Sequence, residues 1–248
     1  MNPNYVIELR NATILHARGG RHASEERRMR GAELVLSDVN LCVARGELVY
    51  FIGRVGSGKS TLLKTLYGEV QLGGGEGYVA GYDLRALRRK DIPFLRRRLG
   101  VVFQDYQLLT DRNVFSNLHY VMRATGWKNE TDIRRRIEEL MAVVGLENKE
   151  YKMPYELSGG QQQRLAIARA LVNSPEVILA DEPTGNLDPA SADAVMEIFR
   201  QIAASGCAVV MSTHNVSLIE DFPSRTVRFG SGAIEELDMQ SLLDRCSE

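Results

Sequence analysis

The sequence predicts an α/β fold with a mainly parallel sheet covered by helices on both faces, and three observations lead to this prediction. A fully apolar run at 177–180 and an apolar run at 207–212 are typical of strands buried inside a sheet. Segments with apolar residues at helical spacing alternate with these runs. A glycine-rich turn at 53–58 joins a third apolar run to a helix, which is the order of elements in a phosphate-binding loop.

In the amino-terminal part, the sequence pattern predicts three strands and one helix. Apolar alternation indicates strands at 6–12 and 34–43, and the polar residues 19–30 between them predict an exposed hairpin tip or a flexible loop. The apolar run 48–52 predicts the third strand. The helix at 60–67 has apolar residues at helical spacing and stops at Gly68.

In the rest of the chain, the sequence pattern predicts a helical insertion and then strands and helices that alternate again. Helices are expected at 114–123, 133–144 and 159–172, and the second has one apolar stripe. After the strand at 177–180, Asp188 and Pro189 are typical of a helix start, and this helix, 189–204, is ended by Gly206. The last expected strand is 207–212.

Composition restricts the classes of function. The chain has 248 residues, 44% hydrophobic and 25% charged, which is typical of a globular protein. Its 31 lysines and arginines nearly balance 32 aspartates and glutamates, so nucleic acid or anionic lipid would have to be bound locally. No run approaches the ~20 apolar residues that cross a bilayer, and residues 1–10 do not resemble a secretory signal. The three separated cysteines (Cys42, Cys207 and Cys246) fit a reducing compartment, and we expect a cytoplasmic protein.

A phosphate-binding loop is predicted by the pattern G-x-x-x-x-G-K-[ST]. It is matched by Gly53, Arg54, Val55, Gly56, Ser57, Gly58, Lys59 and Ser60, with Thr61 following. Backbone N–H groups of such a loop surround phosphate oxygens, and a side chain in place of glycine would block that approach. We expect Lys59 to reach the β- and γ-phosphates, Ser60 to hold Mg²⁺ and Thr61 to add a hydroxyl contact. A plain glycine turn is the alternative, but a chance match is expected only ~1 time in 100.

Two acids follow the apolar run 177–180, and they are expected to have different roles. Strand ends are where open α/β sheets bind their ligands. Asp181 would complete the Mg²⁺ shell, and Glu182 would orient and deprotonate the water that attacks the γ-phosphate. Alone, such a pair often marks only the start of a solvated loop, so its weight comes from the match to the phosphate loop.

The sequence Leu-Ser-Gly-Gly-Gln at 157–161 would arise by chance on the order of 1 time in 3,000. With the other motifs, it makes the chain resemble the ABC ATPase family over nearly its whole length. In that family the motif, here Ser158, Gly159, Gly160 and Gln161, opens a helix that stabilises the γ-phosphate of ATP bound to the opposite subunit. The local alternative is a serine N-cap followed by two turn glycines.

The resemblance implies roles for four further residues. Gln104 matches the family's Q-loop, which senses Mg²⁺ and the attacking water, and His214 matches the switch histidine, which contacts the γ-phosphate and Glu182. Asp188 matches the D-loop, which crosses the dimer interface, although it is also a good helix N-cap. His16 stands where the family usually has a tyrosine that stacks on adenine.

The resemblance also implies the domain organisation and the assembly. One ABC ATPase domain would span 1–248, with a RecA-like P-loop core and an antiparallel β subdomain at about 1–104 and 173–248. A helical signature subdomain would occupy about 105–172. The chain would form a head-to-tail homodimer with two composite ATP sites. It would dock as a peripheral subunit on a separate membrane protein at the cytoplasmic face of the bacterial inner membrane.

Within the family, residues 92–114 are similar to the FtsE group of cell-division ATPases, whose partner FtsX spans the membrane four times. This likeness implies that ATP turnover controls cell-wall hydrolysis and that the stretch around Tyr106, Leu108 and Leu109 receives a partner helix or belongs to the subdomain core. Arg96–Arg98 can equally be a solvated basic helix face. An ATPase of lipoprotein release or macrolide export is the alternative, because residues 180–188 are shared with those groups. A nucleic-acid partner is not expected, since a basic excess and long heptads are lacking.

Overall fold

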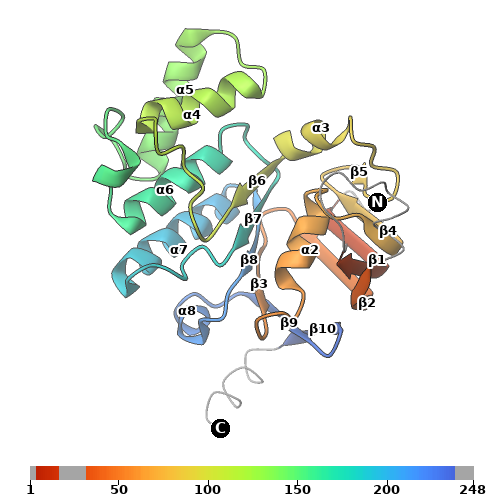
Figure 1. The fold of residues 1–248 in the computed structure, drawn as a ribbon. Helices are drawn as coiled ribbons and strands as arrows, with labels where there is room; N and C mark the ends of the chain where they lie inside the picture. Colours follow the sequence, from red (N-terminus) through yellow and green to blue (C-terminus); the bar gives the residue numbers. More distant parts are fainter. Residues whose placement is uncertain (1–3, 17–31, 238–248) are drawn as a thin grey trace.

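The computed structural model describes residues 4–16 and 32–237, and it places two sheets side by side (Figure 1). The larger sheet has the strand order β10-β9-β3-β8-β7-β6. Its strands are β3 (Leu48–Ile52), β6 (Leu99–Val102), β7 (Val177–Asp181), β8 (Ala208–Ser212), β9 (Arg225–Gly230) and β10 (Ala233–Leu237). Neighbouring strands pair in parallel, except β9 and β10, which form an antiparallel hairpin.

The smaller sheet is antiparallel, in the order β2-β1-β4-β5. It consists of β1 (Tyr5–His16), β2 (Glu33–Ala44), β4 (Leu72–Val79) and β5 (Tyr82–Asp83). The helices are α2 (Lys59–Leu66), α3 (Ile92–Arg97), α4 (Val114–Ala124), α5 (Glu130–Val143), α6 (Gly159–Ala170), α7 (Pro189–Ala204) and α8 (Val216–Asp221), with a 3₁₀ turn η1 (Pro154–Glu156). The predicted fold class, a P-loop α/β fold with an antiparallel sheet and inserted helices, is confirmed.

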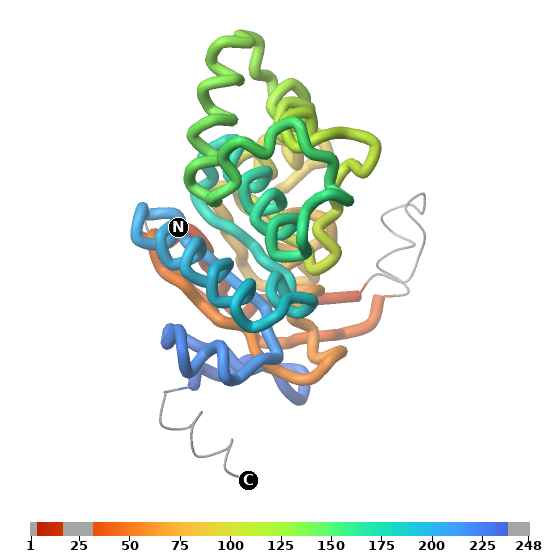
Figure 2. Tube along the Cα trace, turned by 90° about the vertical axis from the view of Figure 1, so that its left-hand side faces the viewer, coloured from red at the N-terminus to blue at the C-terminus, as the bar shows by residue number. Residues whose placement is uncertain are grey.

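Two hydrophobic cores lie on opposite faces of the larger sheet because successive strand residues point to opposite sides. Tyr50, Ile178 and Val209 belong to the core that also contains buried residues of α4 to α7. Their neighbours Phe51, Leu179 and Val210 belong to the core formed with α2 and the smaller sheet. Figure 2 shows two helices of the first core, α4 and α5, coloured in shades of green, at one end of the molecule.

The strands and helices predicted from strong apolar patterns are confirmed. Each predicted strand and helix is present within a few residues of its expected ends, and α7 begins and ends as predicted at Pro189 and Ala204. The structure adds β4, β5, β6, β9 and β10 and the short helices α3 and α8, which the sequence patterns did not predict. The polar residues 19–30, expected as a hairpin tip or loop, lie outside the described residues.

Strand β4 escaped prediction because it is rich in glycine, which is unusual in strands. The pairing of β1 with β4 shifts register at these glycines. Asn11 has a φ of 46° there, and Gly75 has a φ of 74°. A Cβ atom on Gly75 would lie 2.2 Å from the carbonyl oxygen of Asn11. The close approach of the two backbones therefore requires glycine at this position. In the described ranges, no helix is long and apolar enough to cross a membrane.

Candidate functional site

Four adjacent parallel strands of the larger sheet end at the same edge, and a predicted site residue follows each of them. The order β3-β8-β7-β6 brings together the phosphate loop after β3, His214 after β8, Glu182 after β7 and Gln104 after β6. Carboxyl ends of parallel strands form the ligand-binding edge of open α/β sheets. The sheet topology therefore assembles residues that lie far apart in the sequence.

The phosphate loop has the groups that an anion needs. Gly58 precedes α2 with a left-handed φ of 103°, so the loop turns sharply into the helix N-terminus. Lys59 is 5% exposed, and its Nζ donates to the carbonyl oxygens of Gly53 at 2.7 Å and Arg54 at 3.1 Å. The buried hydroxyl oxygen of Ser57 has no hydrogen-bond partner among the described residues. Polyphosphate fits this cradle, because it would give partners to an orphaned hydroxyl, a buried cation and free backbone N–H groups.

Asp181 connects the phosphate loop to the end of β7. The hydroxyl of Ser60 donates to Asp181 Oδ1 at 3.0 Å, and the hydroxyl of Ser212 donates to the same oxygen at 2.6 Å. Ser212 also accepts a hydrogen bond from the backbone N–H of Glu182 at 2.9 Å. These contacts place Ser60 beside Asp181 and tie the backbone of Glu182 to β8, while the metal-binding role of Ser60 and Asp181 stays a prediction.

Glu182 and His214 form a pair. His214 Nδ1 lies 3.2 Å from Glu182 Oε2, with the glutamate side chain 21% exposed and the histidine 61% exposed. Glu182 has a φ of 48°, which is uncommon for a residue with a Cβ atom and is seen at functional sites. A cavity of about 340 Å³ lies against both side chains, between the loops that follow β7 and β8. The carboxylate therefore faces a space large enough for water and a phosphate group.

Gln104 contacts the loop that follows Glu182. Its Nε2 donates to Asn186 Oδ1 at 3.3 Å, and Asn186 Nδ2 donates to the Gln104 carbonyl oxygen at 3.2 Å. This reciprocal pair links the segment after β6 to the segment after β7. The expected contact of Gln104 with a metal and with the attacking water stays a prediction.

The signature residues Ser158 to Gln161 open helix α6. Ser158 is its N-cap, and it exchanges hydrogen bonds with Gln161 in a capping box, both at 3.3 Å. The local interpretation of Ser158 as an N-cap is thus correct. The buried residues of α6 belong to one core and those of α2 to the other. No hydrogen bond or ion pair between described residues joins residues 158–161 to the chain's own phosphate loop.

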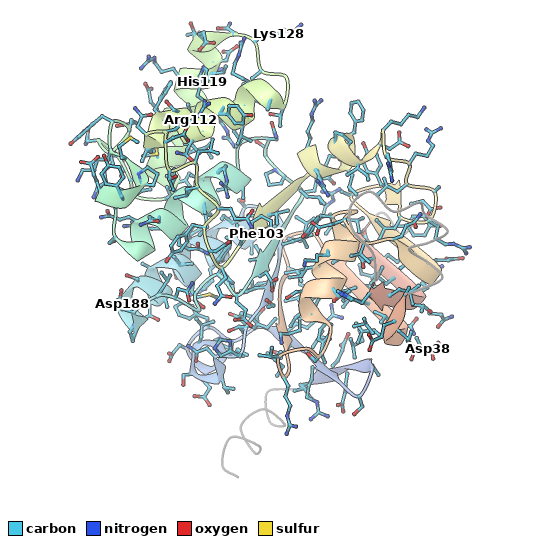
Figure 3. All side chains as sticks on the ribbon, in the orientation of Figure 1. Asp38, Phe103, Arg112, His119, Lys128 and Asp188 are labelled. Atoms are coloured by element: carbon cyan, nitrogen blue, oxygen red, sulfur yellow. The ribbon has the colours of Figure 1, made fainter. Side chains whose placement is uncertain are left out.

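Asp188 caps the N-terminus of α7, as its local pattern suggested. Its side chain accepts from the backbone N–H of Ser191 at 3.0 Å, and hydrogen bonds from Ser191 lower the pKa of this carboxyl group. Figure 3 shows Asp188 at the edge of the molecule. It is exposed, so a further role at an interface stays compatible with its position.

His16 is the last residue of β1, where it pairs with Glu33 of β2 and is exposed. A cavity of about 700 Å³ beside Gly53 to Ser57 is lined on its other side by β9 and β10, and His16 is not among its lining residues. The structure therefore does not bring His16 to this space. Its contact with adenine stays a prediction.

Three contributing residues were not predicted as part of the site. Ser212 positions Asp181 and Glu182, Asn186 binds Gln104, and Arg169 of α6 donates to the carbonyl oxygens of Tyr106 at 2.8 Å and of Gln107. Ser212 had a signal, because it is a fully buried hydroxyl at the end of an otherwise apolar strand. Asn186 and Arg169 act through contacts between distant segments, which the sequence pattern does not contain.

The sequence model of the ABC transporter family matches residues 36–185. A second family model, of an AAA domain, matches only residues 153–220, which are a small part of the chain. Among curated proteins, the chain is 44% identical over 199 residues to the cell division ATP-binding protein FtsE of Streptococcus pneumoniae, covering 80% of this chain and 86% of the relative. It is 40% identical over 202 residues to FtsE of Escherichia coli strain K12, covering 82% and 90%.

Solved structures agree with this assignment. The dimeric structure of a post-hydrolysis state of the ATP-binding cassette MJ0796, bound to ADP and Pi, is 30% identical, with a TM-score of 0.77 and coverage of 94% of this chain and 99% of that one. The cbiO1 protein of Clostridium perfringens, part of the cbiONQ ABC transporter complex, is 23% identical with a TM-score of 0.81 and coverage of 98% and 95%, which supports the fold. The phosphate loop, the acidic pair and the switch histidine thus stand in a chain that belongs to the ABC transporter family, as an ATP hydrolase of the FtsE group.

Proposed function

We propose that the chain hydrolyses ATP as one half of a head-to-tail homodimer, with each ATP held between the phosphate loop of one subunit and the signature residues of the other. The observation that carries this proposal is that, within one chain, the signature helix packs apart from the residues of the phosphate site. Lys59, Asp181 and Glu182 gather at one sheet edge, whereas the signature helix α6 packs in the core on the opposite face from α2. The relative MJ0796 is a dimer in its post-hydrolysis structure, which supports the same arrangement here.

In this proposal Glu182 is the general base. Its carboxylate orients a water molecule in line with the γ-phosphate and accepts a proton as the water oxygen bonds to phosphorus. The bond from phosphorus to the β–γ bridging oxygen breaks, giving ADP and phosphate, and the proton leaves Glu182 with the product phosphate. His214, 3.2 Å from Glu182, holds the carboxylate in place. Lys59 exchanges its two carbonyl partners for phosphate oxygens, and the N-terminus of α6 from the other subunit stabilises the developing charge.

Ser60, Asp181 and Gln104 are the residues proposed to hold Mg²⁺. Hydroxyl, carboxylate and amide oxygens are the donors that this ion prefers, and it usually takes its other ligands from water and substrate phosphates. The described residues contain no cluster of three or more His, Cys, Asp or Glu side chains that could form an all-protein metal cage, which suits a shared site of this kind. When bound, the ion neutralises charge on the phosphates.

Replacing Glu182 with Gln tests the chemistry. The amide keeps the size of the side chain but cannot accept the proton, so we expect ATP hydrolysis to fall by about 10²–10⁴-fold while ATP binding persists and a dimer accumulates. Steady-state ATPase assays and gel filtration with ATP measure both effects. The exposed Glu220→Gln serves as the matched control and should behave as wild type. An unchanged rate in Glu182→Gln would remove this residue from the base role.

We further propose that the dimer binds an FtsX-like membrane protein at the cytoplasmic face of the inner membrane and controls cell-wall hydrolysis during division. The likeness to FtsE proteins supports this role. A groove of about 340 Å³ lies between α2 and the segment after β6. It is lined by Tyr67, Glu69, Phe103 and Gln107 and also by Ser60 and Asp181 of the proposed metal site, so a helix docked there would lie beside that site. It is our candidate for docking a cytoplasmic helix of the partner. Leu108, in contrast, packs against the core that contains α4 to α7.

Co-purification from membranes tests the partner. We expect recovery of a protein with four membrane spans, with a loss of recovery when Phe103 is changed to Asp and no loss when the exposed Tyr120 is changed to Asp. Mass spectrometry identifies the captured chain. A partner with a large multi-domain extracytoplasmic module would instead indicate an export pump of the lipoprotein-release or macrolide type.

A further inference from the structure

A concentrated basic surface lies between β5 and the end of α3. Residues 85–98 contain seven arginines and lysines against a single aspartate, in a chain whose formal net charge is -1. Six of these cations are exposed: Arg85, Arg88, Arg89, Lys90, Arg96 and Arg98. We call residues 85–98 the basic surface. Such a local excess attracts anions even though the whole chain is nearly neutral.

Among the described residues, most charges of the basic surface have no ion-pair partner. Arg88 pairs with Asp91 at 2.8 Å, and Arg98 pairs with Glu176. The guanidinium of Arg85 donates, within the described ranges, to the backbone carbonyl oxygen of Gly75 at 3.4 Å. In the part of the chain that the structure describes, Arg89 and Lys90 have no ion-pair partner. Unpaired cations so close together repel one another, and a bound anion would relieve this repulsion.

A cavity of about 430 Å³ opens beside the basic surface. Arg85, Arg88 and Arg89 contribute to one part of its lining. The rest of the lining combines apolar side chains, which include Leu15, Val70, Leu84, Leu87 and Ile92, with the polar side chains of Thr65, Glu69 and Gln71. Arginine forks bind phosphate oxygens, and the apolar wall suits hydrocarbon. Together these two halves match an anionic amphiphile better than a fully hydrated anion.

An aromatic side chain extends this surface. Phe94 on α3 is 54% exposed, and the guanidinium of Arg97 lies 5.3 Å from its ring centroid. Exposed aromatic rings beside cations are typical of surfaces that sit at the boundary between membrane and water. Glu69 lines both this cavity and the proposed partner groove, so the two sites are neighbours on the molecule.

We propose that the basic surface and its cavity bind the headgroups of anionic phospholipids, so that the chain contacts the membrane directly as well as through a partner. This proposal rests on the proposed membrane location but not on the identity of the partner. The phosphodiester lies against Arg85 and Arg89, and the glycerol and upper acyl chain lie against Leu87 and Ile92. Binding holds the ATPase at the bilayer while its partner groove stays beside the membrane surface.

The apolar part of the cavity favours lipid over nucleic acid, because it can cover the carbons of an acyl chain, which nucleic acid lacks.

The test is sedimentation of the purified full-length chain, without partner, with two kinds of vesicles. One contains phosphatidylcholine alone and the other phosphatidylcholine mixed with phosphatidylglycerol. We expect binding only to the anionic vesicles, and weaker binding as salt is raised. The triple variant Arg85→Gln, Arg89→Gln, Lys90→Gln should bind at least about tenfold more weakly, because each cation near an anionic surface contributes about fivefold. Phe94→Ser should weaken binding as well.

A matched control removes the same charge elsewhere. The triple variant Lys128→Gln, Arg135→Gln, Arg200→Gln changes three exposed cations outside the basic surface and should bind vesicles like wild type. Equal binding to both vesicle types, absence of binding, or equal losses in both triple variants would overturn the proposal. So would binding of a DNA or RNA oligonucleotide that depends on Arg85 and Arg89 while vesicle binding does not.

The ATPase rate separates this proposal from the proposed function. Residues Arg85, Arg89 and Lys90 lie outside the ATP site, so the first triple variant should hydrolyse ATP at the wild-type rate. A chain that binds anionic vesicles without hydrolysing ATP would contradict the proposed function alone. An active chain that ignores anionic vesicles would contradict the lipid site alone.

Discussion

Asn117 shows how a single side chain can hold a segment of the site. It is fully buried in α4, where Oδ1 accepts from the Leu109 backbone N–H at 2.8 Å. Its Nδ2 donates to the carbonyl oxygens of Leu109, Arg112 and Asn113, each at 3.0 Å. One amide thus fixes the loop that runs from Gln104 toward the helices.

We expect Asn117→Ala to lower the free energy of unfolding by about 2–4 kcal/mol. Several backbone groups of the loop would lose their partner, and each buried group left without one costs about 1–3 kcal/mol. Urea denaturation measures the change, with the exposed Gln201→Ala as control. A loss below about 0.5 kcal/mol, the usual range for surface substitutions, would mean that water replaces the amide.

Residues with a chemical reason for their type were predictable, and residues that act through folded contacts were not. Lys59, Asp181, Glu182 and His214 carry recognisable patterns, and the structure brings the last two together. Asn117 has no such pattern, because an asparagine in a helical sequence is ordinarily expected on the exposed face. Its role depends on a loop that folds back from eight residues earlier.

At the scale of elements, the signature helix is joined to two parts of the site. The first turns of α6 and α7 pack so closely that a Cβ atom on Gly160 would lie 2.7 Å from the hydroxyl oxygen of Ser191. Farther along α6, Arg169 donates to the carbonyl oxygen of Tyr106, in the loop after Gln104. Helix α6 therefore contacts both the start of α7, which follows Asp188, and the loop after Gln104.

Gly160→Ala should destabilise the fold by about 1–3 kcal/mol, because the added methyl group overpacks the contact between α6 and α7. Combining it with Ser191→Gly should recover part of the loss, since the two positions touch and their effects are not additive. Urea denaturation of both single variants and the double variant gives the coupling energy. Gly230→Ala is the control, because no atom lies within 4 Å of its added Cβ. Strict additivity would contradict the described contact.

Elements were predictable where one residue pattern decides them. The core strands β3, β7 and β8 are continuous apolar runs buried on both faces, and they were predicted nearly to the residue. Strands β4 and β10 depend on pairing instead: β4 is glycine-rich, and β10 carries two glutamates that bind Arg225 and Arg228 of β9. These two strands, one inside the smaller sheet and one at the edge of the larger sheet, are specified by their neighbours, so a pattern along one segment does not show them.

At the scale of the whole molecule, the two cores are proposed to divide the labour. In this proposal the sheet edge with the phosphate loop, Asp181 and Glu182 binds ATP, and the helices packed in the other core present the signature residues to a second subunit. Between described residues, no hydrogen bond or ion pair joins the signature residues to the phosphate loop of the same chain. We therefore propose that the site is completed in trans.

A heterodimer experiment tests this claim most directly. Lys59→Ala disables the phosphate loop, and Ser158→Arg blocks the signature, so each homodimer should be inactive. Two affinity tags allow purification of the mixed dimer only. In trans, a Lys59→Ala subunit beside a Ser158→Arg subunit has one intact site, whereas a wild-type subunit beside the double variant has none.

ATPase measurements on these two purified heterodimers distinguish a site shared between subunits from a site within one chain. If the site is shared, we expect hydrolysis by the Lys59→Ala and Ser158→Arg pair and none by the wild-type and double-variant pair. The reverse result, with activity only where one subunit is fully wild type, would show that each site is complete within one chain and would contradict completion in trans.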